Sequence, residues 1–348
     1  MTLGRYLSRL FAARFVTVLV GLAAVLQLVD LMDRSDEIVE RGLGAAGMAR
    51  YALLRLPLVT APAVPIAILA AAVLTFAALA WRGEIAAMRA AGVAVGRLVS
   101  WLLPAALAAA LLGLVVADRL APAADDAFAG WWAATDPTPE AGGRVWFRAG
   151  LDIVGARVTA RGHRLEDVEL YRRDAAGRLV LVVRAPAAVW RDGGWWLAEA
   201  ETRGGGGGAT TVAVLRWPQG VPPANLLQLA RGEPVLSSAT MRRILDGAWA
   251  GDRPPAVYRQ RLARARARPV MGPVMILLAT PVARGLRRNG GVPAGMAVGL
   301  AAGLSYLLLD GILAALGEAG LLPPLLAAWL AHAVFASLGG AMLLHAEG

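Results

Sequence analysis

Side chains that could perform catalysis are sparse in this sequence, and their spacing matches no catalytic pattern. The three histidines, His163, His332 and His345, lie far apart, and neither an HExxH nor a GxSxG motif is present. The chain has no cysteine, which excludes thiol nucleophiles and cysteine-ligated metals. We therefore expect no catalytic residue, no metal site and no cofactor held by this chain.

Every basic residue is arginine, and this bears on nucleotide binding. A phosphate-binding loop of the GxxxxGK[ST] type needs a lysine, so this chain cannot form one. If the protein uses ATP, another chain must bind it. The net charge is +10, but much of the arginine flanks apolar runs, so anionic lipid explains the charge better than nucleic acid does.

Two ionisable residues, Asp310 and His332, fall inside apolar runs. Such residues are functional candidates by default, because a charge in hydrocarbon is costly. The alternative is a structural residue that lies near the membrane surface or bonds to a neighbouring helix. The sequence leaves both interpretations open.

Composition indicates a membrane protein, with 57% hydrophobic residues and a mean hydropathy of +0.56. The first apolar run follows several arginines but is too long for a signal peptide, so we expect a retained helix. The second contains Pro57, Pro62 and Pro65 and is expected to be kinked or broken. The sequence predicts six transmembrane helices, at about 10–31, 52–80, 99–117, 269–283, 292–316 and 321–344.

The region between the third and fourth runs has a different character. Alternating apolar and polar residues predict short strands in RVWFRAG, LDIVGARVTA, DVELYRRD, LVLVVRAPAAVW, WWLAEAETR and TTVAVLRW. DAAGR and RDGG predict hairpin turns, the glycines at 204–208 predict a mobile loop, and a helix is expected at about 236–250. Antiparallel strands at this spacing indicate a sandwich or jelly roll.

Arginine placement predicts the orientation in the membrane. Arginines precede the first span and lie in the second-to-third and fourth-to-fifth connections, the last including Arg284, Arg287 and Arg288. The first-to-second connection is acidic. Both termini should therefore be cytoplasmic, with the β domain on the opposite side. The arginine run at 259–268 lies on the outer side and needs compensation. It could contact lipid, or it could belong to a helix that buttresses the β domain.

The segment at 82–92, between the second and third spans, predicts a short surface helix that ends at Gly92. Ile85 and Met88 fall on one stripe, and Glu84 near the helix start suits the helix dipole. Such a helix could float in the membrane interface. It could equally dock into a partner protein, because its alanines permit close approach. The residue pattern alone does not choose between these two.

Motifs along the whole chain resemble one family, the LptF/LptG permeases of the lipopolysaccharide-export ABC transporter. GEIAAMRAAGV resembles that family's coupling helix. The resemblance extends through LVDLMDRSDEIV, YALLRLP, RARPVMGPVMILLATPVA, GLSYLLLD, LPPLLAAWLAHAVFASLGG, VWFRAG and RDGGWWLAEA. The first span and YALLRLP are most like the LptG-type subunit.

The resemblance implies a bacterial inner-membrane permease with six helices and a periplasmic jelly roll between helices 3 and 4. It implies four partners: an LptB-type ATPase dimer that binds the ATP, an LptF-type permease, and periplasmic LptC-type and LptA-type proteins. The substrate would be lipopolysaccharide. The coupling residues would be Glu84, Ile85, Met88, Arg89 and Gly92.

Basic residues at the outer end of the first helix contact lipid in that family, and Arg34 and Arg41 occupy this region here. The chain departs from the pattern because Asp33, Asp36, Glu37 and Glu40 lie among them, which weakens the local positive field. An ordinary solvated helix end is the alternative.

The expected organisation is therefore a first helical part at 1–118, with the coupling helix at about 82–92, a β domain at 119–258 and a second helical part at 259–348. The competing function is a membrane-anchored scaffold or sensor whose β domain binds a ligand or protein. A lipid-modifying enzyme is disfavoured, because paired carboxylates, a histidine cluster and an activated nucleophile are all missing.

Overall fold

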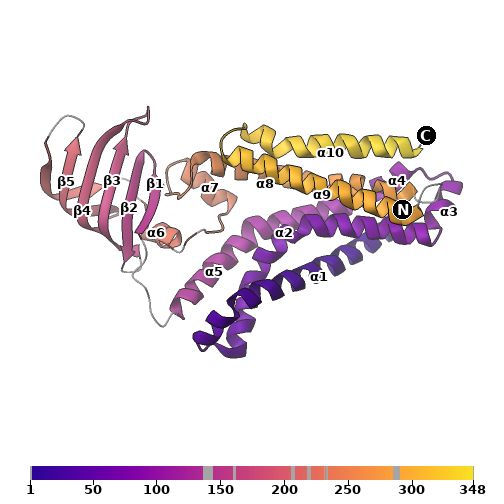
Figure 1. Cartoon of the computed structure of the whole chain (residues 1–348), viewed down its shortest axis with the longest axis horizontal. Coiled ribbons are helices and arrows are strands. Elements are labelled where there is room, and N and C mark those ends of the chain that lie inside the picture. The colour runs from indigo at the N-terminus through magenta and orange to yellow at the C-terminus, as the bar shows by residue number, and fades with distance from the viewer. Residues whose placement is uncertain are drawn as a thin grey trace. The chain divides into compact units, whose positions relative to one another are not determined.

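The chain folds into two compact units, seen in a computed structural model (Figure 1). The structure describes residues 2–135, 144–159, 162–204, 208–217, 221–230, 232, 234–284 and 291–347. The helical unit comprises Met1–Ala124 and Arg259–Gly348, and the sheet unit comprises Asp125–Tyr258. Arg287, Arg288 and most of the glycine run at 204–208 lie outside the described residues, as do the details of the His345 side chain.

The helical unit is built from long helices joined by short connections. α1 (Thr2–Glu40) and α2 (Gly44–Trp81) precede the short α3 (Glu84–Ala90). α4 (Val95–Val115) continues through one π-helical turn, η1 (Val116–Leu120), into α5 (Ala121–Ala134). After the sheet unit come α8 (Pro255–Leu278), the 3₁₀ turn η3 (Thr280–Arg284), α9 (Gly291–Glu318) and α10 (Pro324–Glu347).

Five helices in the described ranges are long and apolar enough to cross a membrane: α1, α2, the α4–α5 segment, α9 and α10. α8 does not join them, because it carries five arginines between Arg259 and Arg268 and only the residues after them form an apolar run. The count of six spans therefore stays a prediction. The prolines of α2 do not break it, since the helix is continuous from Gly44 to Trp81.

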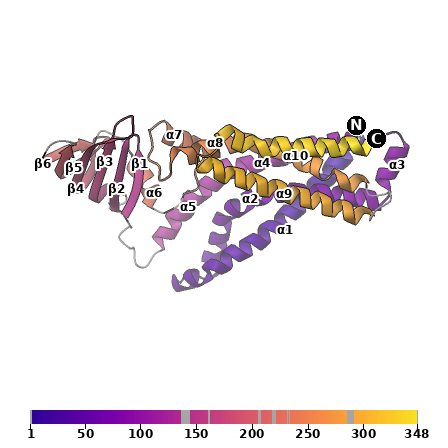
Figure 2. The same cartoon turned by 45° about the horizontal axis from the view of Figure 1, so that its top comes forward.

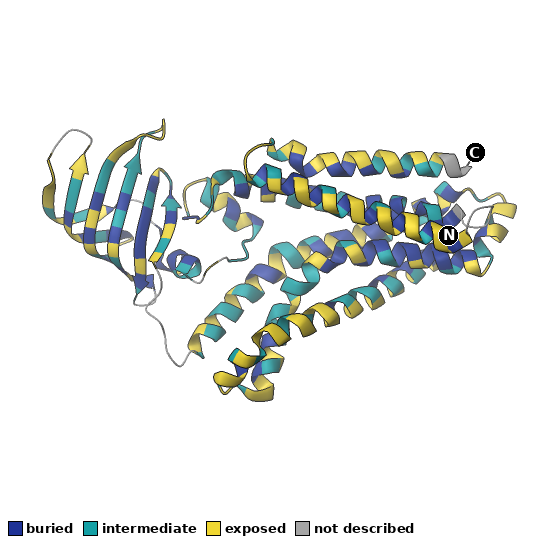
Figure 3. Cartoon of the chain, viewed as in Figure 1, coloured by how far each residue is buried: buried dark blue, intermediate teal, exposed yellow. Residues whose placement is uncertain are grey.

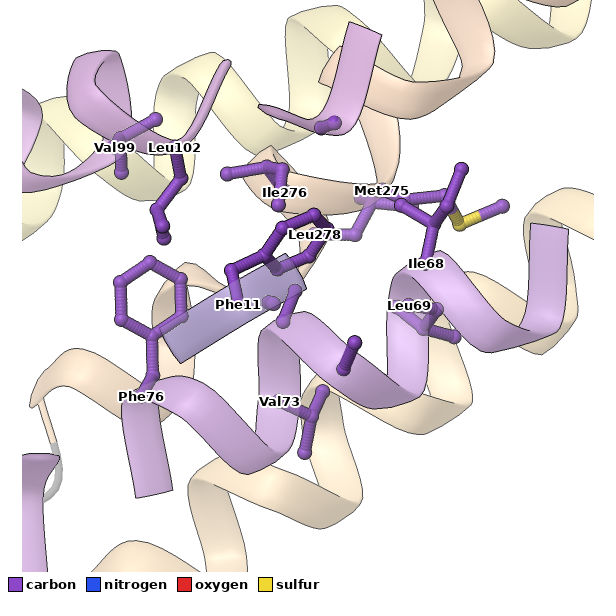
Figure 4. Close-up of a cluster of buried hydrophobic side chains, with 14 of the residues drawn as sticks. Phe11, Ile68, Leu69, Val73, Phe76, Val99, Leu102, Met275, Ile276 and Leu278 are labelled. Carbon is purple, nitrogen blue, oxygen red and sulfur yellow. The ribbon is translucent and has the colours of Figure 1, made fainter. Parts of the chain in front are cut away.

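α2 forms the centre of the helical unit. It is buried along 72% of its most apolar stretch, whereas α1 is buried along only 11%. Figure 4 shows Ile68, Leu69 and Phe76 of α2 converging with side chains from α1, α4 and α8. Between membrane helices, such packing stabilises the unit through van der Waals contacts and not through removal of apolar surface from water.

Glycines allow two helix pairs to approach closely. A Cβ added to Gly272 of α8 would lie 2.4 Å from the backbone oxygen of Ala106 in α4, and one added to Gly303 of α9 would lie 2.1 Å from the Leu69 side chain. Close backbone approach through small residues is the usual way in which membrane helices pack.

The outer faces of the helical unit are apolar. Large aliphatic side chains are exposed along α1, α9 and α10, including Val20, Leu28, Leu308 and Leu325 (Figure 3). Contiguous apolar faces of this kind are unfavourable in water and fit a lipid surface or a protein partner.

The sheet unit contains one six-stranded antiparallel sheet in which each strand pairs with the next along the chain. The strands are β1 (Arg144–Ala149), β2 (Asp152–Thr159), β3 (Arg164–Arg173), β4 (Leu179–Arg191), β5 (Gly194–Gly204) and β6 (Thr210–Trp217). All six predicted strands are therefore present. A jelly roll needs Greek-key crossovers, and the described strands form a meander without one, so the jelly roll is not confirmed.

The turns and helices of the sheet unit follow local sequence signals. Asp192 and Gly193, both with positive φ, form the β4–β5 hairpin turn. α6 (Pro223–Ala230) contacts β1 and β2. α7 (Ser238–Leu245) is shorter than predicted and is capped by Ser237, whose hydroxyl oxygen accepts a hydrogen bond from the Thr240 backbone N–H.

Asp152 of β2, Arg172 of β3 and Trp217 of β6 form a hydrogen-bonded triad. Asp152 is fully buried, and its carboxylate accepts hydrogen bonds from Arg172 at 3.0 and 3.1 Å and from the Trp217 indole N–H at 2.9 Å. The hydrogen bonds to Asp152 raise the pKa of the Arg172 guanidinium. Because the carboxylate has partners on both of its oxygens, its burial is tolerated.

We predict that Trp217→Phe destabilises the sheet by about 1–3 kcal/mol, because it removes one donor from a buried carboxylate. The measurement is backbone hydrogen exchange of β2, β3 and β6 in the full-length protein. Trp196→Phe is the matched control, since its indole N–H donates to the Arg191 carbonyl oxygen at an exposed site. Equal exchange in the two variants would contradict the role of the triad.

We also predict that Gly272→Ala destabilises the helical unit by about 1–3 kcal/mol, because the new methyl group would push α8 away from α4. Gly311→Ala is the control: its added Cβ meets nothing within 4 Å, and alanine favours the helix. Thermal unfolding in detergent should show a lower Tm for Gly272→Ala alone. An unchanged Tm would mean that this contact does not constrain the helices.

Candidate functional site

The predicted coupling residues lie on α3, and the structure explains why this helix is short. Gly92 takes a positive φ of 84° just past the helix end. Its N–H donates to the Arg89 carbonyl at 3.0 Å, and the Val93 N–H donates to the Met88 carbonyl at 2.9 Å. This pair of bonds is the Schellman motif, in which glycine is favoured because other residues are strained.

α3 has an anchored face and an open face. Ile85 is completely buried within the hydrophobic core of the helical unit, and Met88 packs partly against the same core. Ala86, Ala87 and Arg89 are exposed. Among the predicted coupling residues, Ile85 therefore faces inward and cannot touch an outside partner, whereas Arg89 and Gly92 are accessible.

α3 lies at the end of the helical unit where both chain termini lie (Figures 1 and 2). There the first half of α1 lies within electrostatic range of α3. Arg14 of α1 is repelled by Arg82, which precedes α3, and attracted by Glu84 of α3. One terminal nitrogen of Arg14 is buried without a hydrogen-bond partner among the described residues.

The predicted lipid-binding arginines lie at the other end of α1. Arg34 is on the last turns of α1, and Arg41 follows the helix end directly. Both bind Glu37, with nitrogen–oxygen distances of 2.9 Å from Arg34 and 2.8 Å from Arg41. The structure thus brings the two arginines to one carboxylate, which cancels part of their charge.

A second ion pair fixes this end of α1 to α2. Arg55 donates two hydrogen bonds to the Asp30 carboxylate, at 2.7 and 3.2 Å. The Tyr51 hydroxyl donates to the Asp30 backbone oxygen at 3.4 Å. A bidentate arginine–carboxylate pair holds a defined geometry, so it positions the helix end that carries Arg34.

The intramembrane candidates, Asp310 and His332, belong to one polar cluster. Asp310 forms an ion pair with Arg264 of α8. His332 of α10 is 4% exposed, and its Nε2 lies 3.1 Å from the Tyr306 hydroxyl of α9. Both candidates are thus bonded to a neighbouring helix, which is the structural role that the sequence left open. The cluster lines a cavity of about 230 Å³.

Acidic residues neutralise part of the positive charge of the arginine run at 259–268. Arg261 pairs with Glu318 at 3.1 Å, and Arg264 pairs with Asp310. Both acids lie on α9, so these arginines join α8 to α9.

Sequence reasoning missed Tyr306 and did not connect Arg264 with Asp310. A usable signal was present, because Tyr306 and Asp310 are four residues apart, as are Arg264 and Arg268. That spacing places each pair on one helix face. What the sequence could not supply was the pairing of the two faces across some 40 residues of chain, which is set by tertiary packing.

The chain matches one family model over nearly its whole length. The model describes the lipopolysaccharide export system permease LptF/LptG and covers residues 5–345. A comparison with proteins of curated function found no match. The family model does not separate LptF-type from LptG-type chains. With its apolar helices and its sheet unit, the chain belongs to the LptF/LptG family of multi-pass inner-membrane permeases for lipopolysaccharide export.

Proposed function

We propose that this chain is the LptG-type permease subunit of an ABC transporter that extracts lipopolysaccharide from the inner membrane and passes it to a periplasmic bridge. It binds no cofactor, and an LptB-type ATPase dimer binds the ATP. An LptF-type permease is its membrane partner, and LptC-type and LptA-type proteins accept the lipid. Membership of the export family supports this assembly.

One observation carries the coupling proposal: α3 is anchored on one side and open on the other. A floating interfacial helix would bury its apolar side in lipid, but α3 inserts Ile85 into the protein core. A partner that pushes on Ala87 or Arg89 therefore moves a side chain buried in the hydrophobic core of the helical unit. We assign Glu84, Met88, Arg89 and Gly92 to the docking segment, with Ile85 as its internal anchor.

The push can reach the lipid through α1. Arg14, in the first half of this helix, is attracted by Glu84, and Arg34 lies 20 residues further along, about 30 Å away in a continuous helix. α1 is the least buried span, so it can shift or tilt at less cost than α2.

At that far end, a lipid phosphate would compete with Glu37 for Arg34 and Arg41. Arginine binds phosphate through two parallel hydrogen bonds, and its charge persists at all relevant pH values. The carboxylate holds the two side chains ready in the absence of lipid. Because Glu37 is only partly enclosed, the exchange of one anion for another costs little desolvation.

The orientation follows from arginine placement. We propose that both termini and α3 face the cytoplasm and that the sheet unit faces the periplasm, where it receives the lipid against its apolar residues. The functional parts are then 1–118, 119–258 and 259–348. A scaffold or sensor role would need neither an ATPase contact nor a lipid site, and the two experiments below separate these functions.

We predict that Ala87→Trp abolishes ATPase docking while the fold is retained, because Ala87 is exposed on the open face of α3. Co-purification of the ATPase subunit with a tagged chain should fall at least about tenfold, a difference of 1.4 kcal/mol in binding free energy. Ala319→Trp, at the exposed turn after α9, is the control and should retain the ATPase. Undiminished co-purification with Ala87→Trp would refute docking through α3.

We predict opposite effects at the outer end of α1. Arg34→Gln should lower photocrosslinking of lipopolysaccharide from a probe at the neighbouring exposed Met32, whereas Glu37→Gln should raise it by releasing both arginines. Arg5→Gln, exposed at the start of the same helix, is the control for overall charge. If Glu37→Gln lowers crosslinking, or Arg34→Gln leaves it unchanged, Arg34 and Arg41 do not bind the lipid phosphate.

A further inference from the structure

The arginine run on α8 contains one residue whose charge the described structure leaves uncompensated. Arg261 and Arg264 pair with acids of α9. Arg259 and Arg266 are exposed. Arg268 is only partly exposed, and it makes no hydrogen bond or ion pair to any side chain in the described residues.

Arg268 lines the cavity of about 230 Å³ beside the polar cluster. One end of this cavity is polar and is formed by Arg264, Arg268, Tyr306, Asp310 and His332. The remaining wall is apolar and comes mainly from α2 and α4, through residues that include Pro62, Val64, Ala110 and Leu114. The cavity therefore has a charged end and an apolar wall.

In the described residues, no carboxylate neutralises the positive charge of Arg268 through an ion pair. Asp310 is engaged by Arg264, and Arg264 repels Arg268. Asp310 and Asp118 attract Arg268 through space, without forming an ion pair with it. A partly enclosed guanidinium that lacks a bonded anion is costly, so the site favours an anion that can enter.

His332 lies at the polar end of the cavity, but its ring nitrogens are not open to it. Its Nε2 lies 3.1 Å from the Tyr306 hydroxyl, and its Nδ1 is buried away from any accessible space. Arg268 is therefore the donor that this cavity offers to an anion.

We propose that this cavity binds a phosphate group, with Arg268 as its ligand. A guanidinium binds phosphate through two parallel hydrogen bonds, which one side chain in the cavity lining can supply. The apolar wall favours a phosphate carried by a lipid, whose chain would lie against α2 and α4, over free phosphate. Arg34 and Arg41 are not among the lining residues, so this site is separate from the α1 site and does not depend on the transport role.

The test uses the full-length chain in nanodiscs of phosphatidylcholine, with or without a minor fraction of phosphatidic acid. Native mass spectrometry measures the phosphatidic acid retained per chain. Arg268→Gln should reduce retention about tenfold or more, as expected for the loss of a charged hydrogen-bond donor. Arg266→Gln is the matched control, because it makes the same change at an exposed position two residues away on the same helix.

Thermal unfolding provides a second readout. Phosphatidic acid should raise the Tm of the wild-type chain and of Arg266→Gln, but not that of Arg268→Gln. If Arg268→Gln fails to fold, Arg268→Lys keeps the charge without the planar fork and should show a reduced but measurable Tm increase. Equal retention in Arg266→Gln and Arg268→Gln, or no Tm increase in the wild-type chain, would overturn the proposal.

Inorganic phosphate distinguishes the two sources of the group. If it displaces phosphatidic acid and raises the Tm in an Arg268-dependent way, the site takes free phosphate. If phosphatidic acid binds in that way but inorganic phosphate does not, the site takes a lipid headgroup. Either result supports a phosphate site, and the failure of both probes would remove it.

Discussion

The arrangement of the helical unit depends on the ion pair between Arg264 and Asp310. It allows α8, a helix with five arginines between Arg259 and Arg268, to pack beside α9, which is apolar along most of its length. If Arg264 were removed, the charge of Asp310, whose side chain is only 11% exposed, would remain enclosed without compensation. On the same helix, Arg268 lies in the cavity lining and Gly272 lies against α4.

Packing divides the helical unit into a firm part and a part that can move. α9 rests through glycines on the backbone of η3 and on α2: added Cβ atoms would lie 2.8 Å from the Pro281 oxygen at Gly295 and 2.1 Å from Leu69 at Gly303. Interfaces this close do not deform gradually. α1 has no comparable enclosure, so a displacement imposed at α3 is absorbed more readily by α1 than by α2 or α9.

The sequence predicted elements well where local rules decide them. The six strands, the hairpin at Asp192–Gly193 and the end of α3 at Gly92 follow from alternation and from glycine's tolerance of positive φ. The fourth span was less predictable, because the arginines of α8 interrupt the apolar signal while tertiary ion pairs keep the helix intact. Sheet topology was not predictable either, since alternation identifies strands and not the order in which they pair.

At the candidate sites too, the local sequence identified residues but not their contacts with distant segments. The glycine and the alanines of α3 revealed an accessible segment, but the inward position of Ile85 depends on contacts with helices distant in sequence. The acidic residues near Arg34 and Arg41 correctly indicated a weaker local positive field. The spacings of three and four residues around Glu37 place both arginines beside this carboxylate on a helix, a signal that the sequence contained and that the prediction did not use. Asp310 and His332 were noticed because they are rare in apolar runs, whereas their partners were not.

The two ends of α1 constrain how coupling can work. In the first half of α1, Arg14 is repelled by Arg82 and attracted by Glu84, and near the far end of α1 Glu37 shares its carboxylate between two arginines. α1 can couple its two ends only if it has two positions that differ in interaction energy with α3 at one end and with lipid at the other. Linkage then requires reciprocity: a partner docked on α3 that favours lipid binding near Arg34 must itself bind more tightly when lipid is present, and by the same factor. Ile85 is essential to this argument, because an α3 without an anchor in the core would yield to the partner without moving α1.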